Sequence, residues 1–204
     1  MDLTTKLILA SSIVLTSCSI NPLEPLYKNI KINEIVINDA IRTNPNASSI
    51  IQINRNDEHL AILSSHSNGI YRWVNSMNEQ FITENGKVIK VIGTDYDFDI
   101  INYKGFLSKS NKNKALLRFK DPDSGYLEIF FEYKKIKKGT LTKPISGEYY
   151  SYTLYQEDFY VPLIGWKGTN FYWVDNDKNV WLTKQELEPF GTKIRLKLLK
   201  KYSR

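Results

Sequence analysis

Several acidic residues in this sequence have a spacing that could serve metal binding. Asp175, Asp177 and Asn179 alternate, and Glu186 follows eleven residues after Asp175, which matches most of a calcium-binding EF-hand loop. The sixth position of such a loop requires glycine for a sharp bend, whereas this chain has the β-branched Val180 there. The pattern therefore favours a polar hairpin turn over a calcium site, and we expect neither a metal nor a cofactor.

Other polar residues could carry acid–base chemistry without forming a recognisable motif. Glu148, Glu157 and Asp158 could supply two well-placed carboxylates, which is all that glycoside hydrolysis requires. His59 and His66 show no metal-ligand spacing. We expect that the chain is not an enzyme, and the alternative is a glycan-modifying or glycan-hydrolysing periplasmic enzyme that uses acidic pairs.

Aromatic residues are concentrated near the C-terminus. From Tyr149 to Trp181, 11 of 33 residues are aromatic. Exposed rings could stack on sugars and hydrogen-bond their hydroxyl groups, while buried rings would fill a core. The candidates for glycan or partner contact are Trp166, Trp173 and Trp181, and Trp166, which lies between two glycines, is the best candidate for an exposed ring.

The N-terminus has the organisation of an export signal. Lys6 supplies a positive charge, and residues 7–16 form an apolar stretch of about ten residues, too short to span a bilayer, which takes roughly 20. Residues 1–17 are therefore predicted to be a signal peptide.

The lone cysteine of the chain, Cys18, follows this stretch directly. Leu15-Thr16-Ser17-Cys18 resembles the bacterial lipobox, in which the cysteine thiol receives a lipid. Several acyl chains, palmitate among them, would anchor Cys18 stably in a membrane. By resemblance to Gram-negative lipoproteins, Ser19 is compatible with the outer membrane. The alternatives are a plain signal peptide with an incidental cysteine and a buried N-terminal helix.

The remainder of the chain has the pattern of a β protein. Residues 18–25 contain two prolines and are expected to tether the lipid to a single β-rich periplasmic domain over residues 26–204. Asn68-Gly69 and Asn85-Gly86 are strong hairpin signals. The expected strands occupy residues 50–53, 60–64, 70–74, 81–83, 87–92, 115–119, 126–133, 149–160, 170–174, 180–182 and 193–198. The fold class is mainly β, with antiparallel sheets forming a sandwich or a barrel-like domain and little helix.

The formal net charge of +6 suggests an anionic neighbour of the protein. Phospholipid headgroups and acidic polysaccharides are compatible with an exported protein, whereas nucleic acid is not expected. The alternative is that solvated strand faces are simply rich in lysine.

Two longer stretches resemble the YjbF/GfcB family of lipoproteins. The first comprises Trp73-Val74-Asn75-Ser76, residues 81–90 and residues 93–98. The second runs from Asn170 through Trp173-Val174-Asp175 to Val180, Thr183-Lys184-Gln185 and Pro189. Lys87, Lys90, Thr94 and Asn179 depart from the residues usual in the family, which leaves open which polysaccharide system is served.

The resemblance implies a mainly β lipoprotein that assists the production or export of capsule or exopolysaccharide. We expect it to act by binding polysaccharide or proteins of the export machinery, without catalysis. It would attach to the membrane through its N-terminal lipid, at the periplasmic face of the outer membrane.

Overall fold

The computed structural model describes residue 41 and residues 46–54, 58–105 and 110–202. The expected signal peptide (1–17), Cys18 and the tether (18–25) lie outside the described residues, as does the start of the domain expected from residue 26. No helix within the described ranges is long and apolar enough to cross a bilayer.

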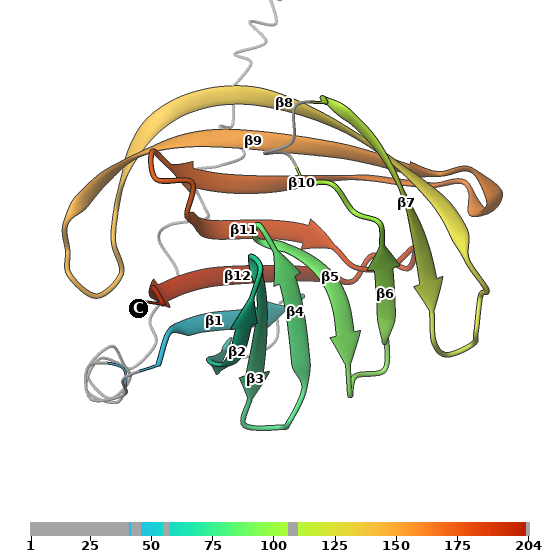
Figure 1. Ribbon diagram of the computed structural model, residues 1–204, viewed down its shortest axis with the longest axis horizontal. Helices are drawn as coiled ribbons and strands as arrows, with labels where there is room; N and C mark the ends of the chain where they lie inside the picture. The colour runs from blue at the N-terminus through green and yellow to red at the C-terminus, as the bar shows by residue number, and fades with distance from the viewer. Residues whose placement is uncertain (1–40, 42–45, 55–57, 106–109, 203–204) are drawn as a thin grey trace, which may run out of the picture. The chain divides into compact units, whose positions relative to one another are not determined.

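Twelve strands form a closed antiparallel barrel (Figure 1). Each strand pairs with the next one along the chain, and β1 pairs with β12 to complete the ring. The strands are β1 (Ser48–Ile53), β2 (Glu58–Ser67), β3 (Ile70–Asn75), β4 (Gln80–Glu84), β5 (Lys87–Ile92), β6 (Phe98–Ile101), β7 (Lys112–Phe119), β8 (Leu127–Thr142), β9 (Tyr149–Val161), β10 (Trp166–Asp175), β11 (Val180–Glu186) and β12 (Lys193–Lys200). A 3-10 turn, η2 (Pro162–Ile164), precedes β10. The mainly β prediction is confirmed, with the barrel as its form.

Two hairpin turns follow directly from the sequence. Asn68 and Gly69 have φ angles of 51° and 79°, and Asn85 and Gly86 have 49° and 79°. A two-residue turn with both φ angles positive matches the twist of the flanking strands, and asparagine and glycine tolerate that conformation best. These turns fix the registers of β2 with β3 and of β4 with β5.

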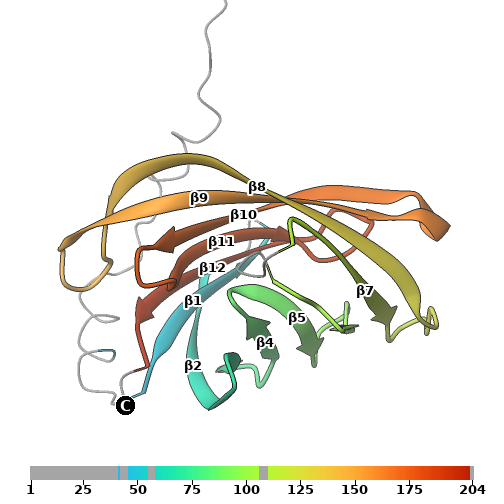
Figure 2. The ribbon, with the colours of Figure 1, turned by 45° about the horizontal axis from the view of Figure 1, so that its top comes forward.

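Alternation of side chains builds the core inside the barrel. In β8, every second residue from Leu127 to Tyr133 is buried, while Glu128 and Glu132 between them are exposed. Each large apolar side chain buried in this way stabilises the fold by roughly 1.5–3 kcal/mol. In Figure 2, β8 to β12 form a broad wall, and β4, β5 and β7 lie on the facing side.

The structure adds one strand and lengthens several predicted ones, among them β2, β7, β10 and β11. The largest differences are at β6 and β8. Strand β6 was not predicted, and β8 was expected to end at Tyr133 but continues to Thr142. The added part of β8 is rich in lysine, which has a low strand propensity. It is nevertheless a strand because it pairs with β9 as far as Thr142 opposite Tyr149, so that its backbone groups are hydrogen-bonded.

Candidate functional site

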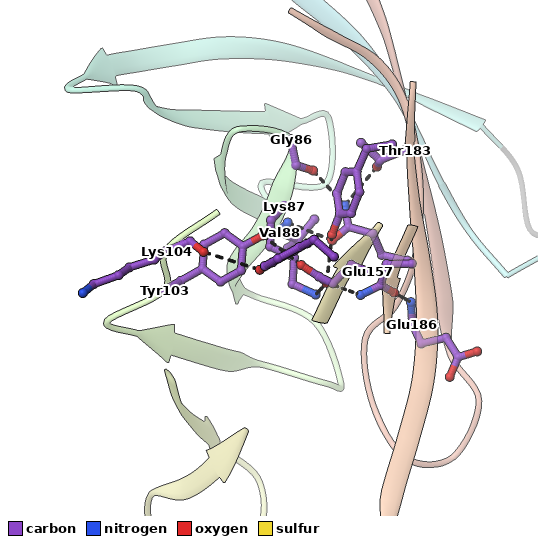
Figure 3. Close-up of polar contacts among 12 residues, drawn as sticks. Gly86, Lys87, Val88, Tyr103, Lys104, Glu157, Thr183 and Glu186 are labelled. Carbon is purple, nitrogen blue, oxygen red and sulfur yellow. Dashed lines mark hydrogen bonds and ion pairs between the residues drawn. The ribbon is translucent and has the colours of Figure 1, made fainter. Parts of the chain in front are cut away.

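A buried carboxylate lies at the centre of a polar network inside the barrel (Figure 3). Glu157 of β9 is 0% exposed and accepts four hydrogen bonds. Lys87 Nζ of β5 lies 3.0 Å from Glu157 Oε1, and Tyr103 Oη lies 2.9 Å from Oε2. Asn170 Nδ2 and Tyr172 Oη of β10 donate to Oε1 at 2.6 and 3.0 Å. The network therefore joins β5, β9 and β10 through the barrel interior.

The two tyrosines in this network act as hydrogen-bond donors. Burial, together with the negative charge of Glu157, raises the pKa of Tyr103 and of Tyr172 well above the ordinary value for tyrosine. Both phenols therefore stay protonated and donate hydrogen bonds to the carboxylate. Because the four donors satisfy Glu157 where water has no access, the geometry indicates a structural role.

Gln185 of β11 forms a separate set of hydrogen bonds to the backbone on either side of Lys87. Its Oε1 accepts from Val88 N at 3.0 Å, and its Nε2 donates to Gly86 O at 2.8 Å and to Thr183 Oγ1 at 2.9 Å. The turn between β4 and β5 is thereby held against β11.

Gly86 allows this contact to be close. A Cβ atom on Gly86 would lie 2.6 Å from a methyl group of Val180, and its φ of +79° already disfavours other residues. The backbone of the turn between β4 and β5 therefore packs directly against the side chain of Val180 at the start of β11.

A pocket of about 150 Å³ opens next to this contact, and we call it the mouth pocket. It lies at the end of the barrel where β2–β3, β4–β5 and β10–β11 are joined, since residues of all three turns line it. Its lining comprises aromatic rings, amides, hydroxyls, lysines and apolar side chains: Ser49, Gly69, Tyr71, Trp73, Thr83, Asn85, Gly86, Lys178, Asn179, Val180, Thr183, Leu196, Leu198, Lys201 and Tyr202. No carboxylate, histidine or cysteine is among these lining residues.

Two rings of the mouth pocket are nearly parallel. The ring planes of Tyr71 and Trp73 differ by 12°, and their centroids are 6.1 Å apart. Trp73 Nε1 donates to Thr83 Oγ1 at 3.1 Å, which fixes the indole. Trp73 is 6% exposed and belongs to the core, whereas Tyr71 is half-buried and Tyr202 is exposed, so the two tyrosines are the rings within reach of a ligand. Rings beside amides and hydroxyls are suited to sugars, whose CH faces stack and whose hydroxyl groups form hydrogen bonds.

Asp175 organises the turn between β10 and β11. Burial alone would favour its protonated form, but hydrogen bonds from Trp181 and Asn179 and the charge of Lys201 lower the pKa of Asp175 below its ordinary value. Its Oδ2 accepts from Trp181 Nε1 at 2.7 Å and lies 3.4 Å from Lys201 Nζ. Val180 begins β11, so the EF-hand-like pattern forms a hairpin turn here.

The tryptophans predicted to contact glycans or partners lie apart from the mouth pocket. Trp173 is 2% exposed and Trp181 is 5% exposed, so both are buried, although neither belongs to the main core cluster inside the barrel. Lys143 and Lys201 lie over the Trp181 ring, 5.9 and 5.2 Å from its centroid. Trp166, the best candidate for an exposed ring, is half-buried and packs edge-on against Phe159 at 4.7 Å.

The acidic residues considered for catalysis each have partners of their own. Glu157 is enclosed by its four donors, and Asp158 accepts from Lys134, Gln156 and Thr169. Glu148 pairs with Lys143 at the turn between β8 and β9. None of the three lines the mouth pocket.

Sequence reasoning missed the residues of the mouth pocket. Tyr71, Trp73, Asn85 and Tyr202 are scattered along the chain and meet only once the barrel closes. Part of the signal was present, since Tyr71 and Trp73 have the two-residue spacing that places side chains on one face of a strand.

Comparisons with known proteins bear on family and fold. Residues 33–199 match the family described as group 4 capsule polysaccharide lipoprotein GfcB, YjbF. The crystal structure of the hypothetical lipoprotein YmcC from Escherichia coli K12 is similar with a TM-score of 0.71 and 14% identity, covering 84% of this chain and 95% of that one. The crystal structure of a lipoprotein from Parabacteroides distasonis has 10% identity over 76% of this chain and 92% of that one. Its TM-score of 0.39 is too low to support an argument about the fold. No curated protein matches the chain.

Proposed function

The chain belongs to the YjbF family of group 4 capsule polysaccharide lipoproteins, and we propose that it assists capsule production or export by binding a segment of polysaccharide in the mouth pocket. The observation that carries this proposal is the lining of that pocket. The accessible rings of Tyr71 and Tyr202 adjoin amides and hydroxyls at this end of the barrel, and the buried Trp73 supports Tyr71 from behind.

The same lining supports binding without catalysis. Glycoside hydrolysis uses two carboxylates that flank the bond to be cleaved. Among the described residues that line the mouth pocket, none is acidic. Glu157 is the most deeply buried of the acids considered, and its oxygens are occupied by donors from β5 and β10 and by Tyr103.

The proposed place of action is the periplasmic face of the outer membrane. The family is one of lipoproteins, which belong to the cell envelope, and Cys18 follows a lipobox-like sequence. In this proposal the acyl chains on Cys18 hold the barrel at the membrane. Replacing Cys18 by alanine should abolish incorporation of labelled palmitate, and unchanged labelling would contradict the anchor.

The binding proposal is tested by Tyr71→Ala, with Tyr160→Ala as a matched control. Tyr160 is 46% exposed on β9 and does not line the mouth pocket. Binding of purified capsule oligosaccharide is followed by tryptophan fluorescence. Tyr71→Ala should bind roughly three- to tenfold more weakly, which is the loss of affinity expected when one aromatic contact is removed. Tyr160→Ala should bind like the unaltered protein.

The same variants are then scored for surface polysaccharide in a deletion strain. The Tyr71→Ala gene should restore less polymer than the Tyr160→Ala gene at equal protein level. Normal polymer in the deletion strain itself would overturn the proposed function. Loss of polymer without oligosaccharide binding would point instead to contact with export proteins.

A further inference from the structure

Much of the net positive charge of the protein is concentrated in one segment. Residues 134–148, here called the lysine arm, comprise the C-terminal half of β8 and the turn into β9. The arm contains five lysines and one glutamate, in a chain whose formal net charge is +6. The lysines are Lys134, Lys135, Lys137, Lys138 and Lys143.

Three of these lysines form no ion pair with a described residue. Lys134 lies 2.9 Å from Asp158, and Lys143 lies 2.6 Å from Glu148. Lys135, Lys137 and Lys138 have no such acidic neighbour within the described ranges, and all three are exposed. Their charges are therefore available to an external anion.

The three lysines lie on β8, next to β9 and β10 in the sheet, and project from both faces of that sheet. Lys135 is paired with Tyr155, and its Nζ lies 5.9 Å from the centre of that ring, on the same face. After the bulge at Ile136, Lys137 and Lys138 are successive residues of the strand, opposite Leu154 and Thr153. Successive residues of a strand point to opposite faces, so Lys137 and Lys138 diverge.

This arrangement favours a flexible linear polyanion over a flat anionic surface. The pairing of β7 with β8 ends at Glu132, so β8 borders the sheet at these lysines. A bilayer can approach only one face of the sheet at a time, whereas a polymer chain can pass around this edge and contact lysines on both faces. Lysine is a compact, hydrated charge on a flexible stem, suited to polyanions without a fixed geometry.

We propose that the lysine arm binds the acidic groups of a polysaccharide chain by charge. The inference rests on the proposed function, since it makes the polymer handled by this protein an acidic one. The mouth pocket would recognise individual sugars, and the arm would add an electrostatic contribution to the affinity that weakens as the salt concentration rises.

The test compares two triple substitutions that remove the same charge. The arm variant is Lys135→Gln, Lys137→Gln and Lys138→Gln. The control is Lys112→Gln, Lys120→Gln and Lys193→Gln, whose lysines lie 3.8, 3.7 and 3.5 Å from acidic partners on other strands. All proteins are mature chains from residue 18 that also carry Cys18→Ser, so that no lipid contributes. Circular dichroism checks that each variant folds.

Binding is measured to polygalacturonate, a polymer of acidic sugar, and to neutral dextran at low and at physiological salt. The arm variant should bind polygalacturonate about tenfold more weakly at low salt than the unaltered protein. The control should change less, and binding to dextran should be the same for all three proteins. Equal losses in both variants, or no loss in the arm variant, would overturn the inference.

Vesicles of phosphatidylglycerol and phosphatidylcholine provide the other anionic surface. If the arm variant loses vesicle binding but keeps its affinity for polygalacturonate, the arm is a lipid contact and the inference is wrong. The proposed function is judged separately, because Tyr71→Ala is scored on capsule oligosaccharide and surface polymer. If the arm variant keeps its affinity for polygalacturonate, the Tyr71→Ala test of the proposed function still stands.

Discussion

Replacing Lys87 by methionine should strongly destabilise the barrel. The substitution keeps the length of the side chain but removes the cation 3.0 Å from Glu157, whose side chain is 0% exposed. Tyr103, Asn170 and Tyr172 still donate to the carboxylate, but a buried charge then has no countercharge. Breaking a buried pair in this way costs about 3–5 kcal/mol of unfolding free energy.

The complementary change, Glu157→Gln, should cost about 3 kcal/mol, since it strands the ammonium of Lys87 in the interior. The faces of Phe131 and Phe159, 5.4 and 5.7 Å from Nζ, compensate for only part of that loss. The double variant Lys87→Met/Glu157→Gln contains no buried charge and should lose only about 1–2 kcal/mol. The two single effects should therefore be non-additive by at least about 2 kcal/mol.

Urea unfolding followed by circular dichroism measures this cycle. The Lys87→Met midpoint should fall by roughly 1–3 M at unchanged slope, and the double variant should recover most of that shift. A loss below about 1 kcal/mol for Lys87→Met, or a double variant equal to the sum of the single ones, would refute the assignment of the pair as a buried, coupled unit.

Two further predictions concern the turns that line the mouth pocket. Gly86→Ala should lower the free energy of unfolding, measured in urea, by about 1–3 kcal/mol, because it combines backbone strain with a clash against Val180. Gly69→Ala is the matched control, since Gly69 has the same φ of +79° but no atom within 4 Å of an added Cβ. Equal losses in the two variants would contradict the clash. The lowered pKa of Asp175 means that its carboxylate stabilises the folded state above the unfolded pKa, and that this contribution is lost as pH falls through the folded pKa. The melting temperature of Asp175→Asn should therefore lie below that of the unaltered protein at neutral pH and approach it in acid, and a gap independent of pH would exclude this role.

Local features of the fold were predictable because neighbouring residues determine them. The asparagine–glycine turns and the alternation in residues 193–198 require no knowledge of the rest of the chain. That alternation predicts Ile194, Leu196 and Leu198 to point inward; Ile194 and Leu196 are buried, while Leu198 is half-buried. The extension of β8 was not predictable in this way, since its lysines are in a strand only because β9 lies beside them.

The candidate site was less accessible to sequence reasoning for the same reason. Tyr71 and Tyr202 come together because β1 pairs with both β2 and β12, an event that no local pattern specifies. Tryptophan-rich sequence drew the prediction to β10 and β11, where Trp173 is buried. Aromatic density in a sequence indicates a core as readily as a binding surface, so it cannot by itself locate a site.

The pairing of β1 with β12 also bears on how the protein folds as it is made. Ser49 Oγ donates to Lys197 O at 3.0 Å across 148 residues of sequence. One edge of β1, the first described strand, therefore stays unpaired until β12, the last strand, has been synthesised. Until β12 is available, β1 and β11 present unpaired strand edges that invite association with other chains. Contacts so distant in sequence form slowly. A newly made chain therefore remains prone to aggregation until the eight residues of β12 have been added. Premature termination before Lys193 should lead to aggregation or proteolysis and not to a smaller functional barrel.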